Sequence, residues 1–115
     1  HGGVSAALLD ETIGRAINVL EPDTWAVTVE INTRYKKPVP YGVTLTATGR
    51  VTENNRRLFT GEGAILLPDG TVAVTATAKY MKLKLSDIAD FEANGDSWQC
   101  YPYESDPAEI DLPEA

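Results

Sequence analysis

The sequence predicts one α+β domain in which a helix packs against an antiparallel sheet, followed by an acidic extension. Near the start of the chain, apolar residues recur at three- and four-residue spacing, which is the period of a helix. Further on, four runs of alternating apolar and polar residues are joined by short turns, which is typical of antiparallel strands. This periodicity stops near Leu85. We therefore predict a folded domain over residues 1–83 and an extension over residues 84–115.

The predicted helix covers residues 2–20. One apolar stripe runs along it and consists of Ala6, Leu9, Ile13, Ala16, Ile17 and Leu20. Pro22 ends the segment, because proline removes a backbone donor and clashes with the preceding turn.

The first predicted strand begins at Trp25, where the apolar period changes to two, and Pro38 and Pro40 close it. Its apolar side consists of Trp25, Val27, Val29 and Ile31, and Thr28 belongs to its polar side. The apolar side of the second strand consists of Val43, Leu45, Ala47 and Val51.

Two turns separate the remaining strands. Glu53-Asn54-Asn55 is the predicted turn into a third strand over residues 57–67. Pro68-Asp69-Gly70 is a stronger turn signal and leads into a fourth strand over residues 71–82.

Composition excludes several kinds of site. The 115 residues contain one cysteine, Cys100, and one histidine, His1, which excludes an intrachain disulfide and a zinc site built from Cys and His. No apolar run approaches 18 residues and nothing resembles a signal peptide. We therefore expect no membrane span and a cytoplasmic location.

The formal net charge of −7 argues against a nucleic-acid-binding protein, because binding to phosphates depends on Lys and Arg. The charge is unevenly distributed. Residues 84–115 hold nine acids and one base and carry −8, whereas residues 1–83 hold eight acids and nine bases and carry +1. The near-neutral folded part therefore tolerates an anionic ligand locally, whereas the acidic extension discourages polyanions.

The first residues contain a candidate site for stabilising negative charge. Gly2 and Gly3 leave the backbone N–H groups of a helix N-terminus unobstructed, and the helix dipole favours negative charge there. Such N–H groups are one way to build an oxyanion hole. When the two glycines are considered alone, a tight turn into the helix is the better explanation for them.

Asp10 lies too far into the helix to cap it, and it borders the apolar stripe. An unpaired carboxylate in such a place is costly, so Asp10 is expected to have a partner or a functional role. Glu11 has a simpler explanation, since it precedes Arg15 by four residues, the spacing of a surface ion pair on a helix.

His1-Gly2-Gly3, then six residues, then Asp10, in a helix followed by long strands, resembles the hotdog-fold acyl-CoA thioesterases of the phenylacetate-degradation type. Residues 27–38 look like the second conserved block of that family. Gly49-Arg50-Val51, Gly61-Glu62-Gly63 and Asp69-Gly70 look like the third. The resemblance implies a hotdog fold, a long central helix wrapped by a curved antiparallel sheet. The strand that precedes His-Gly-Gly in the family has no counterpart in this sequence.

The resemblance also implies a mechanism. Asp10 would be the nucleophile or the general base, and the Gly2 N–H would bind the oxyanion. His1 would position the carbonyl or the glycine loop, and Thr28 would orient water or the Asp of a neighbouring subunit. Proteins of this type form active sites across a homodimer interface, so a homodimer or a dimer of dimers is expected.

The substrate implied by the resemblance is an acyl-CoA or acyl-carrier thioester, with no cofactor beyond coenzyme A itself and no metal. Gly3 is expected to contact the substrate. Coenzyme A carries phosphates, which guanidinium groups bind well. The candidates are Arg50, Arg56 and Arg57, with Lys36-Lys37 as a second choice.

Two other functions compete with hydrolysis. Some hotdog domains bind acyl-CoA without hydrolysing it, and a non-catalytic acyl-CoA-binding domain is the main alternative. A hotdog dehydratase is a third possibility, but that chemistry requires a His and a carboxylate that both transfer protons, and the sole histidine, His1, precedes the helix.

Overall fold

The computed structural model describes residues 1–84 and 102–111, and the chain divides into two units, His1–Lys84 and Leu85–Ala115. In the described part of the second unit, the Tyr103 N–H donates to Asp106 Oδ2 and the Asp106 N–H donates to the Tyr103 carbonyl, which forms a turn. The turn predicted near Ser86 to Asp90 lies outside the described residues.

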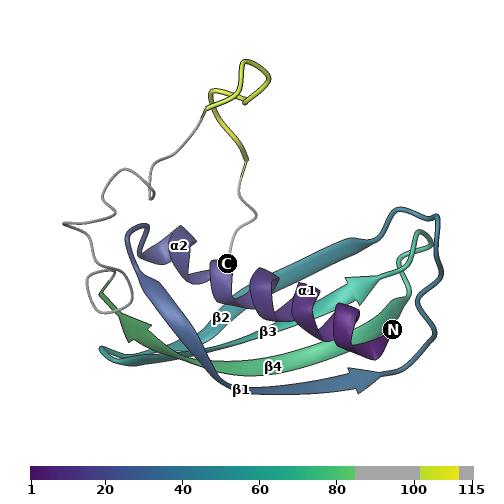
Figure 1. Cartoon of the computed structure of the whole chain (residues 1–115), viewed down its shortest axis with the longest axis horizontal. Coiled ribbons are helices and arrows are strands. Elements are labelled where there is room, and N and C mark those ends of the chain that lie inside the picture. Colours follow the sequence, from purple (N-terminus) through teal and green to yellow (C-terminus); the bar gives the residue numbers. More distant parts are fainter. Residues whose placement is uncertain (85–101, 112–115) are drawn as a thin grey trace. The chain divides into compact units, whose positions relative to one another are not determined.

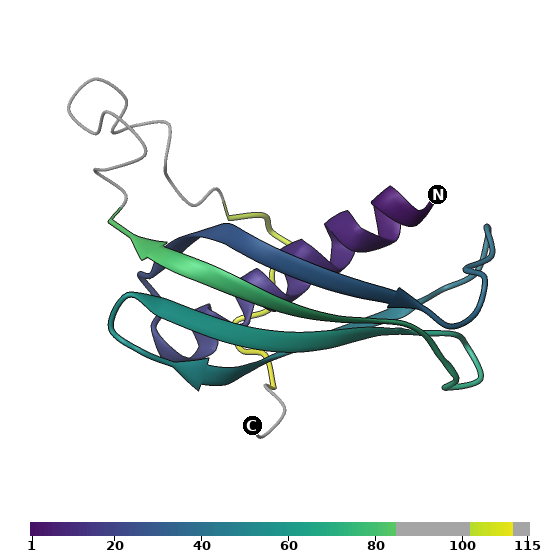
Figure 2. The same cartoon turned by 90° about the horizontal axis from the view of Figure 1, so that it is seen from below.

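The first unit has the predicted α+β arrangement, in which a four-stranded antiparallel sheet curves around one helix (Figures 1 and 2). The strand order is β1-β4-β3-β2, so β1 and β2 are the edge strands of the described sheet. The elements are α1 (Gly2–Arg15), α2 (Ile17–Leu20), β1 (Trp25–Tyr35), β2 (Thr46–Asn54), β3 (Leu58–Leu66) and β4 (Val72–Leu83).

The helix lies unusually close to the sheet because the strands beneath it carry small residues. Leu9 and Ile13 of α1 are fully buried against this floor. The floor consists of Gly49, Gly61, Gly63, Ala76 and Ala78. A Cβ atom at Gly49 would lie 2.7 Å from the carbonyl oxygen of Thr12, which is closer than real Cβ atoms approach. Gly49, Gly61 and Gly63 therefore determine how closely α1 approaches the sheet.

Two predicted boundaries shift. The predicted helix over residues 2–20 is confirmed as two consecutive helices, because at Ala16 the N–H bonds to the Ile13 carbonyl in a tighter turn. The turn predicted at Glu53-Asn54-Asn55 is wrong by two residues. Glu53 and Asn54 stay in β2, where they pair with β3, and the chain turns between Asn54 and Leu58. The Asn54 side chain also bonds Glu21 and Lys82, which holds it in the strand.

The predicted apolar side of the first strand is wrong over half its length. A β-bulge interrupts the register of β1 between Thr28 and Glu30, so the side-chain alternation changes phase there. Ile31 packs against the core as predicted, but Val27 and Val29 are exposed. Ala26 packs against the core instead, and Thr28 turns toward α1.

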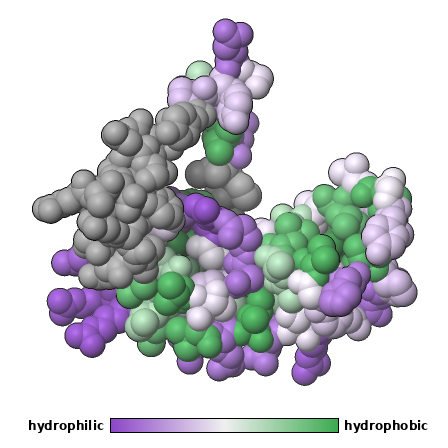
Figure 3. Space-filling view, in the orientation of Figure 1, coloured by the Kyte–Doolittle hydropathy of each residue, from purple (hydrophilic) through white to green (hydrophobic). Residues whose placement is uncertain are grey.

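The exposed apolar residues of the first unit are distributed over several elements. In the space-filling view the hydrophobic residues form separate areas among hydrophilic ones (Figure 3). The large apolar side chains exposed on α1 and β1 are Val4, Leu8, Val27, Val29 and Tyr35.

The close contact at Gly49 gives a stability prediction. Gly49→Ala places a methyl group against the Thr12 carbonyl, so α1 must move off the sheet, and we expect the free energy of unfolding to fall by about 1–3 kcal/mol. Urea unfolding followed by circular dichroism measures this change. The control is Thr48→Ala in the same strand, at an exposed position, with a change within about 0.5 kcal/mol. Equal stability of the two variants would show that α1 does not approach the sheet this closely.

Candidate active site

Asp10 lies on the side of α1 that faces β1 and β4, and its carboxylate is bound by a hydroxyl group from each strand. Thr28 Oγ1 lies 2.9 Å from Asp10 Oδ1 and 3.1 Å from Oδ2. The Tyr80 hydroxyl lies 3.0 Å from Oδ1 and 2.9 Å from the main-chain carbonyl oxygen of Asp10. Asp10 is half-buried. The expected partner of this carboxylate is therefore present, and it is a pair of hydroxyl donors.

Both donors come from one row of the sheet. Thr28 and Tyr80 are directly opposite each other in the β1–β4 pairing, and Tyr80 is opposite Phe59 in the β4–β3 pairing. The rings of Phe59 and Tyr80 stack, with centroids 4.8 Å apart and planes at 16°. The row places two hydroxyl groups under the same helix residue because the bulge in β1 has turned Thr28 to this face.

Tyr80 is the residue that the sequence interpretation missed. Its place in the alternation with Ala76 and Ala78 indicates a side chain on the helix side of the sheet. Alternation does not show which helix residue it meets, since Asp10 lies 70 positions earlier. Burial, followed by the hydrogen bond to the Asp10 carboxylate, raises the pKa of Tyr80 well above its ordinary value. The hydroxyl therefore remains a proton donor.

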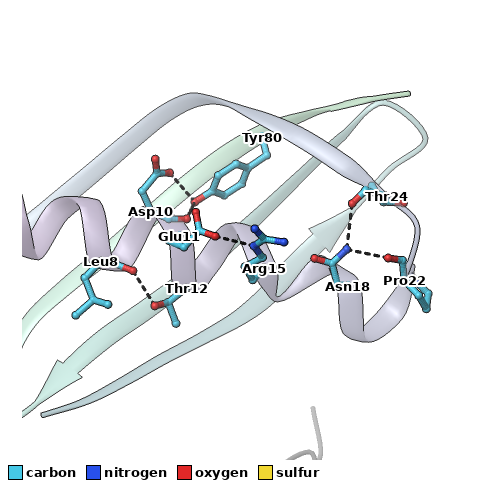
Figure 4. A network of polar contacts seen from close by, with 9 residues as sticks. All are labelled: Leu8, Asp10, Glu11, Thr12, Arg15, Asn18, Pro22, Thr24 and Tyr80. Carbon is cyan, nitrogen blue, oxygen red and sulfur yellow. Dashed lines mark hydrogen bonds and ion pairs between the residues drawn. The ribbon is translucent and has the colours of Figure 1, made fainter. Parts of the chain in front are cut away.

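A pocket of about 490 Å³ opens beside this carboxylate. Asp10, Thr28 and Tyr80 line it together with the apolar surfaces of Pro22 and Trp25. Glu11 and Arg15 also border the pocket, and their side chains form the predicted ion pair at 2.6 Å, shown in Figure 4. The Glu11 carboxylate is thus bound by a guanidinium group, whereas the Asp10 carboxylate is bound by the hydroxyl groups of Thr28 and Tyr80.

The helix N-terminus forms a second candidate site. The His1 side chain caps the helix, and its Nδ1 accepts a hydrogen bond of 2.9 Å from the Gly3 N–H. The Gly3 N–H is therefore not free to bind an oxyanion. Gly2 is the first helical residue, and within the described residues no hydrogen bond is found for its N–H. The Tyr35 hydroxyl donates to the Gly2 carbonyl oxygen, so the last residue of β1 holds Gly2 in place.

The two candidate sites lie far apart in one chain. Gly2 and Asp10 are eight residues apart on the same helix, which corresponds to about 12 Å along its axis. β1 runs beside the helix in the opposite direction, with Thr28 next to Asp10 and Tyr35 next to Gly2. The structure therefore brings Asp10 together with Thr28 and His1 together with Gly2, but it does not bring the two pairs together.

The predicted phosphate-binding residues lie in three places. Arg50 follows Gly49, which faces the helix, so its side chain lies on the opposite face of the sheet, where it pairs with Glu62. Arg56 and Arg57 lie between β2 and β3. None of these three lines the pocket at Asp10.

Lys36 and Lys37 line a pocket of about 380 Å³ together with His1, Gly2 and Tyr35. Of the predicted cations, these two lysines therefore share a pocket with the predicted oxyanion donor.

No group of three or more His, Cys, Asp and Glu residues in the described part of the chain is placed to hold a metal ion. None of the helices in this part is both long enough and apolar enough to cross a membrane.

Solved structures resemble the chain in fold. The BH2602 protein from Bacillus halodurans, solved with CoA, is 32% identical, with a TM-score of 0.66 over 72% of this chain and 58% of that one. The thioesterase HI1161 from Haemophilus influenzae is 28% identical, with a TM-score of 0.63 over 74% of this chain and 59% of that one.

The E. coli PaaI protein from the phenylacetic acid degradation operon is 23% identical, with a TM-score of 0.67 over 72% of this chain and 59% of that one, and supports the fold alone. The chain thus spans about three fifths of the length of these proteins. Among curated proteins, none matches it. The family model of the thioesterase superfamily matches residues 1–79. The predicted hotdog fold is confirmed, and the chain belongs to the thioesterase superfamily.

Proposed function

We propose that this protein hydrolyses acyl-CoA thioesters and that Asp10 is the nucleophile or the general base. The observation that carries the proposal is the Asp10 carboxylate, held by Thr28 and Tyr80 at the edge of an open pocket. Membership of the thioesterase superfamily supports the reaction class, and the CoA found with the BH2602 protein supports the thiol part of the substrate. The His-Gly-Gly to Asp spacing supports the finer assignment to the phenylacetate-degradation type.

In the general-base route, a water oxygen attacks the thioester carbonyl carbon while Asp10 takes a proton from that water. The carbonyl oxygen becomes an oxyanion, which the Gly2 N–H stabilises. When the carbon–sulfur bond breaks, the proton on Asp10 passes to the thiolate. In the nucleophilic route, Asp10 attacks the carbonyl carbon and the thiolate leaves. Water then cleaves the mixed anhydride, which regenerates the Asp10 carboxylate, and the two protons of that water go to the released acid and to the thiolate. Both routes convert one thioester and one water into one carboxylic acid and one thiol.

Each active site needs two copies of the chain, because about 12 Å separates Gly2 from Asp10 within one helix. β1 is an edge strand of eleven residues, which is long enough to pair with a second copy. A twofold axis near Ile31 and Asn32 would place Thr28 of one copy opposite Tyr35 of the other. That arrangement brings Asp10 of one copy toward Gly2 of the other and supports the proposed homodimer.

The same arrangement favours Lys36 and Lys37 as the cations nearest to bound coenzyme A. They share the Gly2 pocket, so each composite site would receive them from the copy that supplies the oxyanion donor. Arg50, paired with Glu62 on the opposite face of the sheet, is less suited to this role. The expected cytoplasmic location stays a prediction.

The first test removes the carboxylate. Asp10→Asn keeps the shape of the side chain but cannot accept the proton or attack the carbonyl, so we expect kcat to fall at least about a hundredfold. Thiol release from acyl-CoA substrates of increasing chain length, followed with a thiol-reactive dye, measures this change. Unchanged turnover in Asp10→Asn would rule out the mechanism. Saturable acyl-CoA binding by the unmodified protein without any product would instead favour the non-catalytic binding domain.

The second test concerns Thr28, with two variants of similar size. Thr28→Val removes the hydroxyl donor to Asp10, and we expect kcat to fall about tenfold or more, since a hydrogen bond to a charged group is lost. Thr28→Ser keeps the hydroxyl and is expected to retain kcat within a few-fold. Equal rates for the two variants in the same thiol-release assay would show that the hydroxyl group has no role.

The third test asks whether two copies share a site. Gly2→Pro removes the Gly2 N–H at the first helical position, where proline is tolerated. We expect Gly2→Pro and Asp10→Asn to be nearly inactive alone. After the two are mixed, unfolded and refolded together, half of the dimers should contain one intact site, which restores about a quarter of the normal activity.

Gly2→Ala is the matched control, because it adds a Cβ atom near the Tyr35 ring but keeps the N–H. It should retain far more activity than Gly2→Pro. A mixture no more active than its two components would show that each site lies within a single chain.

A further inference from the structure

We propose that Tyr80 is a positioning residue of this site: its hydroxyl fixes Oδ1 of Asp10 and leaves Oδ2 as the oxygen that reacts. This inference rests on the proposed function, since it assigns a role to Tyr80 through Asp10. Three features of the described residues support it, namely the distribution of donors around the carboxylate, the rigidity of the Tyr80 ring and the protonation of its hydroxyl.

The two carboxylate oxygens are bound unequally. Oδ1 lies within 3.0 Å of both the Thr28 and the Tyr80 hydroxyl groups. Among the described residues, Oδ2 has one hydrogen-bond donor, Thr28 Oγ1 at 3.1 Å, which also lies within reach of Oδ1. The Thr28 hydroxyl has one proton to donate and lies nearer to Oδ1 than to Oδ2. The Tyr80 hydroxyl shares its proton between Oδ1 and the main-chain carbonyl oxygen, and no hydrogen bond from it to Oδ2 is found among the described residues. Oδ2 therefore keeps its lone pairs available for a water molecule or a carbonyl carbon.

Tyr80 also restrains the rotation of the Asp10 side chain. Its hydroxyl lies within hydrogen-bond distance of two oxygens of the same residue, the main-chain carbonyl oxygen at 2.9 Å and Oδ1 at 3.0 Å. Because one hydroxyl group contacts both atoms, the Asp10 side chain is held in a conformation in which the main-chain carbonyl oxygen and Oδ1 both face Tyr80. The direction of Oδ2 is then fixed as well.

The position of the Tyr80 hydroxyl is itself well determined. Tyr80 is 3% exposed, and its ring stacks on the fully buried Phe59. On the helix side the ring lies against Gly14, where an added Cβ atom would come within 3.2 Å of it. A ring held between a strand neighbour and a helix glycine keeps its hydroxyl in one place, as a preorganised donor requires.

The Tyr80 hydroxyl is held in its protonated form. Burial and the Asp10 carboxylate both raise the pKa of Tyr80, because a phenolate there would be desolvated and would face a like charge. Tyr80 is therefore unsuited to act as a base. Its chemical role at this site is to donate a hydrogen bond, which agrees with a positioning residue.

The test is Tyr80→Phe in the full-length chain, which removes one oxygen atom and keeps the ring that stacks on Phe59. We expect kcat to fall about 10- to 100-fold, because a hydrogen bond to a charged group is lost and the carboxylate turns more freely. KM should stay within about threefold, since Tyr80 acts through Asp10 on the chemical step. The matched control is Tyr41→Phe, at a position that is 93% exposed and lines neither the Asp10 pocket nor the Gly2 pocket, with unchanged kcat and KM.

Stability is measured beside the kinetics, because a buried tyrosine also contributes to folding. Thermal midpoints of all variants are determined, and rates are compared at a temperature where each variant is fully folded. A Tyr80→Phe enzyme with a lower midpoint but an unchanged kcat would overturn the proposal, since the hydroxyl would then act on stability alone. A rise in KM of about 10- to 100-fold without a loss of kcat would overturn the proposal as well.

The outcome separates this inference from the proposed function. If Asp10→Asn is inactive and Tyr80→Phe turns over at the normal rate, Asp10 keeps its role and the role of Tyr80 is refuted. If Asp10→Asn turns over at the normal rate, the proposed mechanism itself is refuted. A large loss of kcat in both variants, with Tyr41→Phe unaffected, supports both assignments.

Discussion

The β-bulge between Thr28 and Glu30 is the constraint on which the candidate site depends. Side chains in a strand alternate between the two faces of the sheet. A single extra residue therefore moves each side chain that precedes it to the opposite face. Without the bulge, the phase set by Ile31 would turn Val29 and Val27 toward the helix and Thr28 away from it. With the bulge, Thr28 meets Asp10, and the valines are exposed along the edge strand. One irregularity in pairing therefore creates both the polar contact at Asp10 and the apolar character of the neighbouring edge.

The depth of α1 in the sheet is the second requirement. Hydrogen bonds from Thr28 and Tyr80 reach Asp10 because the helix rests on a floor of glycine and alanine. Larger residues at Gly49 or Gly61 would lift the helix and lengthen these contacts. Small residues remove apolar contacts from the core, and the large side chains of Phe59, Ile65 and Val74 at the ends of the floor compensate for that loss. Packing and chemistry are therefore coupled through the same few positions.

A single helix presents two different functional groups, one at its N-terminus and one in its middle. The N-terminal end offers an N–H group with the helix dipole behind it, and the side of the helix offers a carboxylate. Since the helix is rigid, the two groups cannot approach each other within one chain. A reaction that uses both must therefore obtain them from two chains, and the edge strand β1, which runs antiparallel to α1, provides a symmetric way to do so. This geometry supports the proposed dimer.

The sequence by itself determined the element types, because helix and strand periods and turn residues such as Asp69-Gly70 are local signals. It also identified Asp10 as a carboxylate in need of a partner, and the Glu11–Arg15 pair followed from spacing on one helix. Only the tertiary structure decided which partner Asp10 has, since Tyr80 lies 70 residues away and the bulge in β1 depends on pairing with β4. Register and close packing are set by contacts between distant segments. The local order of residues determines whether a segment forms a helix, a strand or a turn. Strand register and packing between segments determine which side chains come into contact.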